Sequence, residues 1–227
     1  MAFRNPDSTP GDILQVARSK EEARTSYDRL SRWYDLLTSS EKKITRTGLQ
    51  HLEPHPGERI LEAGFGTGQA LIELGRAVSP GGKAVGVDIS EGMRQVARKR
   101  IVKAGLAETI ELTGGDAVHQ PFKDEAFEAV FMSFTLELFD TPDIPLVLTE
   151  CRRVLRKGGR LGIVALVREN LRSVRVYEWF HVHMPALVDC RPILAREAVE
   201  AAGLEVSTSE IKRVWGLPVE VIIARRI

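Results

Sequence analysis

A glycine-rich turn is the part of this sequence that most clearly bears chemistry. Gly64, Gly66 and Gly68 follow a strand-like run that ends in Glu62, and a helical pattern resumes from about Thr67. Glycine tolerates positive φ and leaves room where a Cβ would collide with a ligand. The free N–H groups at a helix start attract an anionic group. The spacing therefore predicts a loop that binds a small, partly anionic ligand.

Two acidic residues lie where further parts of such a ligand would bind. Asp88 ends the strand-like run 83–88, and Asp116 follows the run 109–113. Open α/β sheets bind ligands at the carboxyl edge of their strands, so these acids and the glycine loop should lie together. Asp88 can accept hydrogen bonds from two vicinal ribose hydroxyls, and Asp116 from an exocyclic amino group such as that of adenine. The three features together predict a nucleoside ligand.

Strand-like and helix-like segments alternate from Arg59 onward and would position these residues. The helix expected over 91–104 has one apolar face, an N-cap at Ser90 and a stop at Gly105. Strands separated by helices pair in parallel through right-handed crossovers. Further helices are expected over 145–155 and 192–202, and strands over 59–63, 83–88, 109–113, 127–132, 160–166, 204–211 and 219–223.

The two ends of the chain depart from this alternation. Residues 215–218 are too few for a crossover helix, so the last two strands should form an antiparallel hairpin. The run 21–50 reads as helical and carries many charges. The predicted fold is α/β: an N-terminal helical extension over residues 1–55, then one doubly wound, mostly parallel seven-stranded sheet with a terminal antiparallel hairpin over residues 56–227.

The composition narrows the class of protein. The 227 residues are 43% apolar, enough for one substantial core. A net charge of +1 argues against a protein that coats nucleic acid. No apolar run is long enough to span a bilayer, and the first residues lack the apolar centre of a signal peptide. Cys151 and Cys190 fit no metal-binding spacing. A soluble, cytoplasmic protein is the simplest expectation.

From about Arg24 onward, the chain resembles the class I S-adenosylmethionine-dependent methyltransferases. The matching residues are the run 61–68, Asp88, the pair Asp116-Ala117 and the run 155–161. The reversed terminal strand of that family also matches the expected hairpin. The resemblance implies an enzyme with S-adenosyl-L-methionine as its cofactor.

The resemblance also implies a place for each part of the methyl donor. The glycine loop would bind the methionine moiety, with Glu62 orienting its amino group. Asp88 would bind the ribose, and Asp116 with the backbone of Ala117 would face the adenine. Phe65 stands where many relatives carry a small residue or cysteine, which should alter packing without removing binding. The expected donor-binding residues are Glu62, Gly64, Phe65, Gly66, Gly68, Asp88, Ile89, Asp116, Ala117 and Ser133, joined by Tyr27 and Tyr34.

The segment 27–37 resembles the N-terminal helix of the ubiquinone and menaquinone C-methyltransferase group. In that group the helix closes as a lid over the donor pocket, so Tyr27 and Tyr34 would contact donor or acceptor. The alternative is that these aromatics form only the apolar face of a docked helix. Carbon methylation of a small, apolar acceptor such as a quinone precursor is favoured. A phospholipid or small-metabolite N- or O-methyltransferase is the alternative.

Carbon methylation of a quinol benefits from a base that deprotonates the phenol. His181 and His183 lie between the fifth strand and the late helix, where insertions that cover the acceptor usually occur, and are the expected catalytic residues. Ordinary lid histidines are the alternative reading. Spacing marks no third ligand beside this pair, so no metal is expected.

Other functions are weighed against methylation of a small molecule. A nicotinamide dinucleotide site needs glycine or alanine where Gln69 stands, so an NAD-dependent oxidoreductase is disfavoured. A donor-binding protein without activity stays open because no base is certain. The fourth strand is followed by Ser133-Phe134 and not by an Asn/Asp-Pro-Pro-aromatic motif, so a nucleic-acid amine is not expected as acceptor.

The basic cluster formed by Lys42, Lys43 and Arg46 raises the question of a membrane. It would suit a peripheral contact with acidic lipid headgroups if the acceptor is a membrane quinone. A solvated helix end is the alternative. The sequence leaves the oligomeric state open, a homodimer included.

Overall fold

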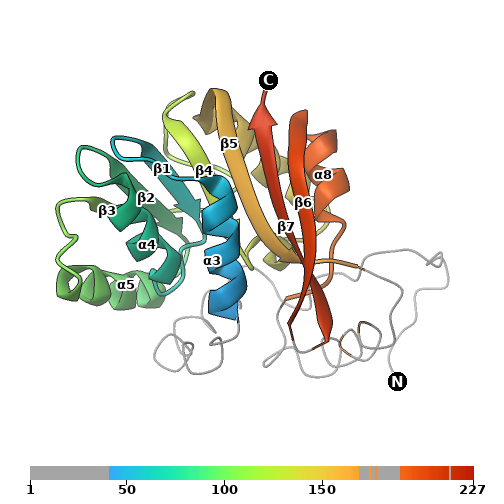
Figure 1. Cartoon of the computed structure of the whole chain (residues 1–227), viewed down its shortest axis with the longest axis horizontal. Helices are drawn as coiled ribbons and strands as arrows, with labels where there is room; N and C mark the ends of the chain where they lie inside the picture. The colour runs from blue at the N-terminus through green and yellow to red at the C-terminus, as the bar shows by residue number, and fades with distance from the viewer. Residues whose placement is uncertain (1–40, 169–173, 175–176, 178–189, 215) are drawn as a thin grey trace.

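A single seven-stranded sheet organises the part of the chain that the computed structural model describes, residues 41–168, 174, 177, 190–214 and 216–227 (Figure 1). The strand order is β3-β2-β1-β4-β5-β7-β6. The strands are β1 (Arg59–Ala63), β2 (Lys83–Asp88), β3 (Ile110–Gly114), β4 (Phe127–Ser133), β5 (Leu155–Leu166), β6 (Leu204–Val214) and β7 (Leu217–Arg226).

The first five strands pair in parallel, and β7 runs antiparallel between β5 and β6. The hairpin predicted at the end of the chain is confirmed, since Val214 pairs with Leu217 and the ladder continues to Leu204 and Arg226. From β1 the chain winds outward to β3 and then returns to β4 beside β1. That reversal opens a crevice at the carboxyl edge between β1 and β4.

Helices cover both faces of the sheet because apolar side chains alternate along the strands. On β1, Ile60 packs into one core layer and Leu61 into the other. The layer with Ile60 lies under α3 (Glu41–Leu52), α4 (Gln69–Val78) and α5 (Glu91–Lys103). The layer with Leu61 lies under α6 (Ile144–Val154) and α8 (Ala195–Ala201). In Figure 1, α3 and α4 lie in front of the sheet.

The helix predicted at α5 is confirmed, whereas β5 and α8 begin at other residues than predicted. The Ser90 hydroxyl accepts a hydrogen bond from the Met93 N–H at 3.1 Å, as expected of an N-cap. Strand β5 begins at Leu155 and not near residue 160, because Leu155 is fully buried and pairs with Phe127 on β4. Helix α8 starts three residues later than expected, because Ile193 forms a parallel bridge to Val167.

Helix α3 is the described part of the predicted N-terminal helical run. Its residues Ile44, Leu49 and Leu52 are buried in the core. A Cβ on Gly48 would lie 2.5 Å from the Val164 Cγ2, so a glycine at this position lets the helix approach β5 closely. The first 40 residues lie outside the described part of the chain, and their role as a lid stays a prediction.

Cys151 on α6 lies inside the core layer that also contains Leu61. Its side chain is fully buried, and its sulfur lies 3.9 Å from the Met132 sulfur. Burial raises the pKa of this thiol to about 12. The thiol is therefore protonated at neutral pH and acts as a small apolar side chain.

Candidate active site

A cavity of about 340 Å³ lies at the crevice between β1 and β4. It collects residues from the carboxyl ends of four strands together with the start of α3. Of the donor-binding residues expected from the sequence, those that line it are Glu62, Gly64, Phe65, Gly66, Asp88, Ile89, Asp116, Ala117 and Ser133. Tyr27, Tyr34, His181 and His183 lie outside the described residues.

The three loop glycines all adopt positive φ, at 76° for Gly64, 50° for Gly66 and 79° for Gly68. Gly66 lines the cavity, and a Cβ there would meet no atom within 4 Å. Gly68 does not line the cavity. It is the left-handed N-cap of α4, where a Cβ would lie 2.9 Å from that of Ala97. The loop thus serves both ligand access and helix packing.

Glu62 is the most deeply buried carboxyl group of the cavity wall, with 3% of its surface exposed. Burial, reinforced by the nearby charge of Asp88, raises the pKa of Glu62 well above its usual value. Its Oε2 has no hydrogen-bond partner among the described residues. A buried carboxyl oxygen without a partner is costly. A bound ammonium group would satisfy it, as the amino group of the methyl donor would.

Asp88 stands at the end of β2 and is fixed by two backbone N–H groups. Its Oδ2 accepts a hydrogen bond from Gly66 and its Oδ1 from Ser90, each at 2.8 Å. A carboxylate has about four acceptor sites, so Asp88 can accept from ribose hydroxyls as well as from these N–H groups. The bond to Gly66 also ties the glycine loop to β2.

Asp116 and Ala117 begin the loop after β3, beside the exposed Ile89. The Asp116 carboxylate accepts a hydrogen bond from the Val118 N–H at 3.0 Å, which closes a tight turn. Ile89, 43% exposed, offers an apolar surface on the same cavity wall. An acceptor oxygen beside an apolar surface suits a purine ring with an exocyclic amino group.

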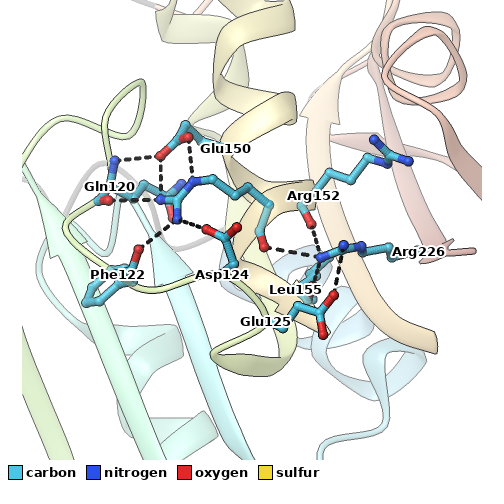
Figure 2. Close-up of polar contacts among 9 residues, drawn as sticks. Gln120, Phe122, Asp124, Glu125, Glu150, Arg152, Leu155 and Arg226 are labelled. Carbon is cyan, nitrogen blue, oxygen red and sulfur yellow. Dashed lines mark hydrogen bonds and ion pairs between the residues drawn. The ribbon is translucent and has the colours of Figure 1, made fainter. Parts of the chain in front are cut away.

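The loop that starts at Asp116 is anchored by Arg153 of α6. Figure 2 labels the partners of Arg153 in this network: Gln120, Phe122, Asp124 and Glu150. The guanidinium donates hydrogen bonds to the backbone carbonyls of Gln120 at 3.1 Å and Phe122 at 2.8 Å, and to the carboxylates of Asp124 at 2.7 Å and Glu150 at 2.8 Å. Glu150 in turn accepts from the Gln120 N–H at 3.0 Å. Arg153 therefore connects the loop after β3 to the C-terminal end of α6. Nearby, Arg226 on β7 donates to the last carbonyls of α6 and pairs with Glu125.

Phe65 is buried inside the glycine loop with 3% of its surface exposed. A Cβ on Gly86 of β2 would lie 2.5 Å from the Phe65 Cδ1, so the ring packs directly on the β2 backbone. The aromatic ring thus fills space under the loop.

The far side of the cavity contains residues that the sequence did not single out. The Thr45 hydroxyl on α3 lies 2.7 Å from the Ser133 hydroxyl at the end of β4, and Thr135 donates to the Gly64 carbonyl at 3.3 Å. Phe134 has a φ of 51°, which is uncommon for a residue with a side chain. The bend turns the chain away from β4 and places Phe134 in the cavity wall.

Glu41 and Glu137 are two further acids at this end. Glu41 lines the cavity, and burial raises its pKa to about 7. Glu137 lies fully buried in the short 3₁₀ helix η1 (Leu136–Leu138), where its Oε1 accepts from the Leu166 N–H at 3.1 Å. Burial raises the pKa of Glu137 to about 8. The sequence signal that could have pointed to Glu137 is an acid inside the largely apolar run 134–139.

The comparisons with known proteins agree with this geometry. Residues 60–159 match a family model described as a methyltransferase domain. The chain is 33% identical over 172 residues to a demethylmenaquinone methyltransferase of Symbiobacterium thermophilum, which covers 73% of this chain and 68% of that protein. It is 32% identical over 202 residues to a nocamycin O-methyltransferase of Saccharothrix syringae. That match covers 88% of this chain and 69% of the relative.

A solved structure of an S-adenosylmethionine-dependent methyltransferase from Aquifex aeolicus has the same fold. Its TM-score is 0.65 at 20% identity, over 88% of this chain and 98% of that one. The nicotinamide alternative finds no support in the family match or in these relatives. This chain belongs to the class I S-adenosylmethionine-dependent methyltransferases and uses S-adenosyl-L-methionine as its methyl donor.

Proposed function

We propose that this methyltransferase acts on a small, apolar acceptor, and that carbon methylation of a quinone precursor is its reaction. The observation that carries the proposal is the wall beyond the donor residues, which Phe134, Leu138 and Phe139 supply. Apolar and aromatic walls suit a fused ring system. The similarity to a demethylmenaquinone methyltransferase supports the same acceptor class.

In this proposal the chain contributes mainly binding and orientation. The bound donor carries its methyl group on a sulfonium. When that methyl group is transferred, a neutral thioether is left behind. Glu62 would bind the donor's ammonium group, Asp88 its ribose hydroxyls and Asp116 the adenine amino group. Fixing two reactants in one cavity removes much of the entropic barrier of a bimolecular step.

Two other acceptor chemistries have an observation in their favour. O-methylation of a small metabolite is supported by the nocamycin O-methyltransferase, which matches a longer part of the chain than the quinone relative does. A phospholipid amine is supported by Lys42 and Arg46, which line the cavity and would suit a phosphate. Within the described residues, no helix combines the length and apolarity needed to cross a membrane.

The test is transfer of a labelled methyl group from S-adenosylmethionine to a panel of acceptors. The panel comprises a short-chain prenyl naphthoquinol, a phenolic metabolite and phosphatidylethanolamine vesicles. The proposal expects carbon methylation of the naphthoquinol, located by mass spectrometry or NMR, to exceed the other reactions at least tenfold. Methylation of oxygen or of the lipid amine alone would contradict it.

A further inference from the structure

Glu41 occupies a fixed position on the far side of the cavity, where the proposed acceptor would bind. It is the first residue of α3 and lines the cavity with a half-buried side chain. One turn further on, the Thr45 hydroxyl lies 2.7 Å from that of Ser133, and Gly48 packs against Val164. These two contacts fix the start of α3 at the carboxyl end of β4. The carboxyl group of Glu41 is therefore presented to the cavity by a packed element.

Most other cavity acids already have partners. Asp88 accepts from two backbone N–H groups, and Glu73 on α4 accepts from Arg46 at 2.8 Å. Asp140 and Asp143 also make polar contacts. Glu62 lies on the donor side, in β1. Glu41, by contrast, forms no hydrogen bond or ion pair with any residue of the described ranges.

We propose that Glu41 is the general base that removes the hydroxyl proton of the acceptor. The proposal rests on the proposed function insofar as the acceptor carries an acidic O–H, as a naphthoquinol does. It requires an acid that reaches the cavity, has no competing partner among the described residues and lines the same cavity as Phe134, Leu138 and Phe139. Glu41 meets all three conditions.

The protonation state of Glu41 suits that task. Burial raises its pKa to about 7, so near neutral pH the group exists both as a carboxylate and as an acid. A base whose pKa lies near the working pH transfers protons most effectively. Glu41 takes the O–H proton. The ring carbon then bonds to the methyl group as the C–S bond breaks, the ring proton on that carbon leaves to water as the ring becomes aromatic again, and Glu41 returns its proton to the oxygen.

The charged groups around Glu41 set the field in which it titrates. Glu137 is buried nearby, and its interaction with the charge of Glu41 contributes to the raised pKa of Glu137. Because the pKa of Glu137 is about 8, it is mostly neutral when Glu41 ionises. The other charged or titratable groups that line the cavity or lie next to Glu137 are Lys42 and Arg46 on α3, Glu62 on β1, Glu73 on α4, Asp88 on β2, and Asp116, Asp140, Asp143 and Arg191 in loops.

The first test is the pH profile of kcat/KM on whichever panel acceptor the wild-type enzyme methylates. Wild-type activity should rise with pH, with a midpoint near 7, and level off above it. Glu41→Gln should lower kcat/KM about 100-fold and abolish that rise, and Glu41→Asp should restore part of both. A Glu41→Gln variant that keeps more than half of the wild-type activity, with the same rise, would overturn the proposal.

The second test does not depend on turnover. In protein labelled with ¹³C at the glutamate carboxyl carbon, one NMR resonance should titrate near pH 7 and be absent from Glu41→Gln. Affinity for S-adenosylhomocysteine, measured by calorimetry, should stay within twofold of wild type, which shows that the fold and the donor site are intact. A Glu41 resonance that titrates below pH 5 would overturn the proposal.

Matched variants separate Glu41 from its neighbours and from the histidines. Glu73→Gln removes a second cavity carboxylate and should leave the pH-dependent rise in place. If His181→Ala with His183→Ala abolishes the rise while Glu41→Gln retains it, the histidines are the base and the proposal is wrong. If wild type methylates only the phenolic metabolite, the quinol assignment fails, while the same Glu41 series on that O–H still decides whether Glu41 is the base. Methylation of the lipid amine alone would overturn both proposals.

Discussion

The carboxyl groups around the cavity have different surroundings. Asp88 accepts hydrogen bonds from the backbone N–H groups of Gly66 and Ser90. Glu62 and Glu137 are buried, and burial favours the neutral acid. One cavity therefore has a hydrogen-bonded carboxyl group for the ribose and, in Glu62, an acid whose protonation a bound ammonium would change. Glu137 lies buried nearby as a largely neutral acid.

Glu137 makes the stability of the protein depend on pH. Its pKa is about 8 in the folded state against 4.5 for an ordinary glutamate, so between these values the folded state binds more protons than the unfolded state. The free energy of unfolding should therefore fall as pH rises through that window. Glu137→Gln keeps the acceptor for the Leu166 N–H but cannot ionise. We expect the variant to gain stability relative to wild type between pH 5 and pH 8.5, measured by urea unfolding. An offset that does not change with pH would contradict this.

Substitution of the loop glycines should affect stability and ligand binding to different degrees. In Gly64→Ala the new Cβ would lie 2.2 Å from the Thr135 Cγ2 at a φ of 76°, so we expect a loss of about 1–3 kcal/mol in the free energy of unfolding. Gly66→Ala meets no atom within 4 Å and should cost only about 1 kcal/mol for its φ.

The added methyl group of Gly66→Ala lies at the cavity, so its main effect should be on ligand binding. Calorimetry should show at least a tenfold weaker affinity for S-adenosylhomocysteine. If Gly64→Ala were as stable as wild type, or Gly66→Ala bound normally, the division of roles between the two glycines would be wrong.

At the scale of elements, the loop that faces the adenine is positioned by α6 through Arg153 (Figure 2). Arg153→Gln removes bonds to two carbonyls and two carboxylates, and we expect a loss of about 1–2 kcal/mol in stability. Donor affinity should fall about threefold to tenfold, because Asp116 and Ala117 begin this loop. Arg156→Gln is the control, since that half-exposed side chain has one polar partner in the part of the chain that the structure describes, Glu128. Equal effects from the two variants would refute a positioning role for Arg153.

At the scale of the whole molecule, donor binding should stabilise the fold as a unit. The cavity joins residues of β1, β2, β4 and α3, so a ligand there contacts both halves of the sheet. S-adenosylhomocysteine at 100 times its Kd should add about 2.7 kcal/mol to the free energy of unfolding. Asp88→Ala should remove most of that gain at the same concentration, and NAD should give none. Stabilisation by NAD would contradict the donor assignment.

The sequence was enough for the architecture because its signals are local. The bounds of β1 and β2 follow from apolar runs flanked by glycine and charge, and the hairpin follows from a connection too short for a helix. The early start of β5 was missed because Leu155 is set by its pairing with Phe127, which no local pattern reveals.

The site was predictable only in part, for the same reason. The glycine loop, Asp88 and Asp116 follow directly from strand ends, and the structure brings them into one cavity. The roles of Glu41 and Glu137 depend on burial by several elements at once, as in the bond from Glu137 to Leu166. The assignments of Tyr27, Tyr34, His181 and His183 stay predictions.

The burial of Cys151 has a practical consequence for spectroscopy. The chain has two cysteines, and the protonated, enclosed thiol of Cys151 should resist maleimides and other alkylating reagents while the fold persists. Cys190 is partly exposed and lies next to Arg191, whose guanidinium donates to the Phe139 carbonyl in the cavity wall. A fluorophore or spin label would then attach at one position in the natural chain.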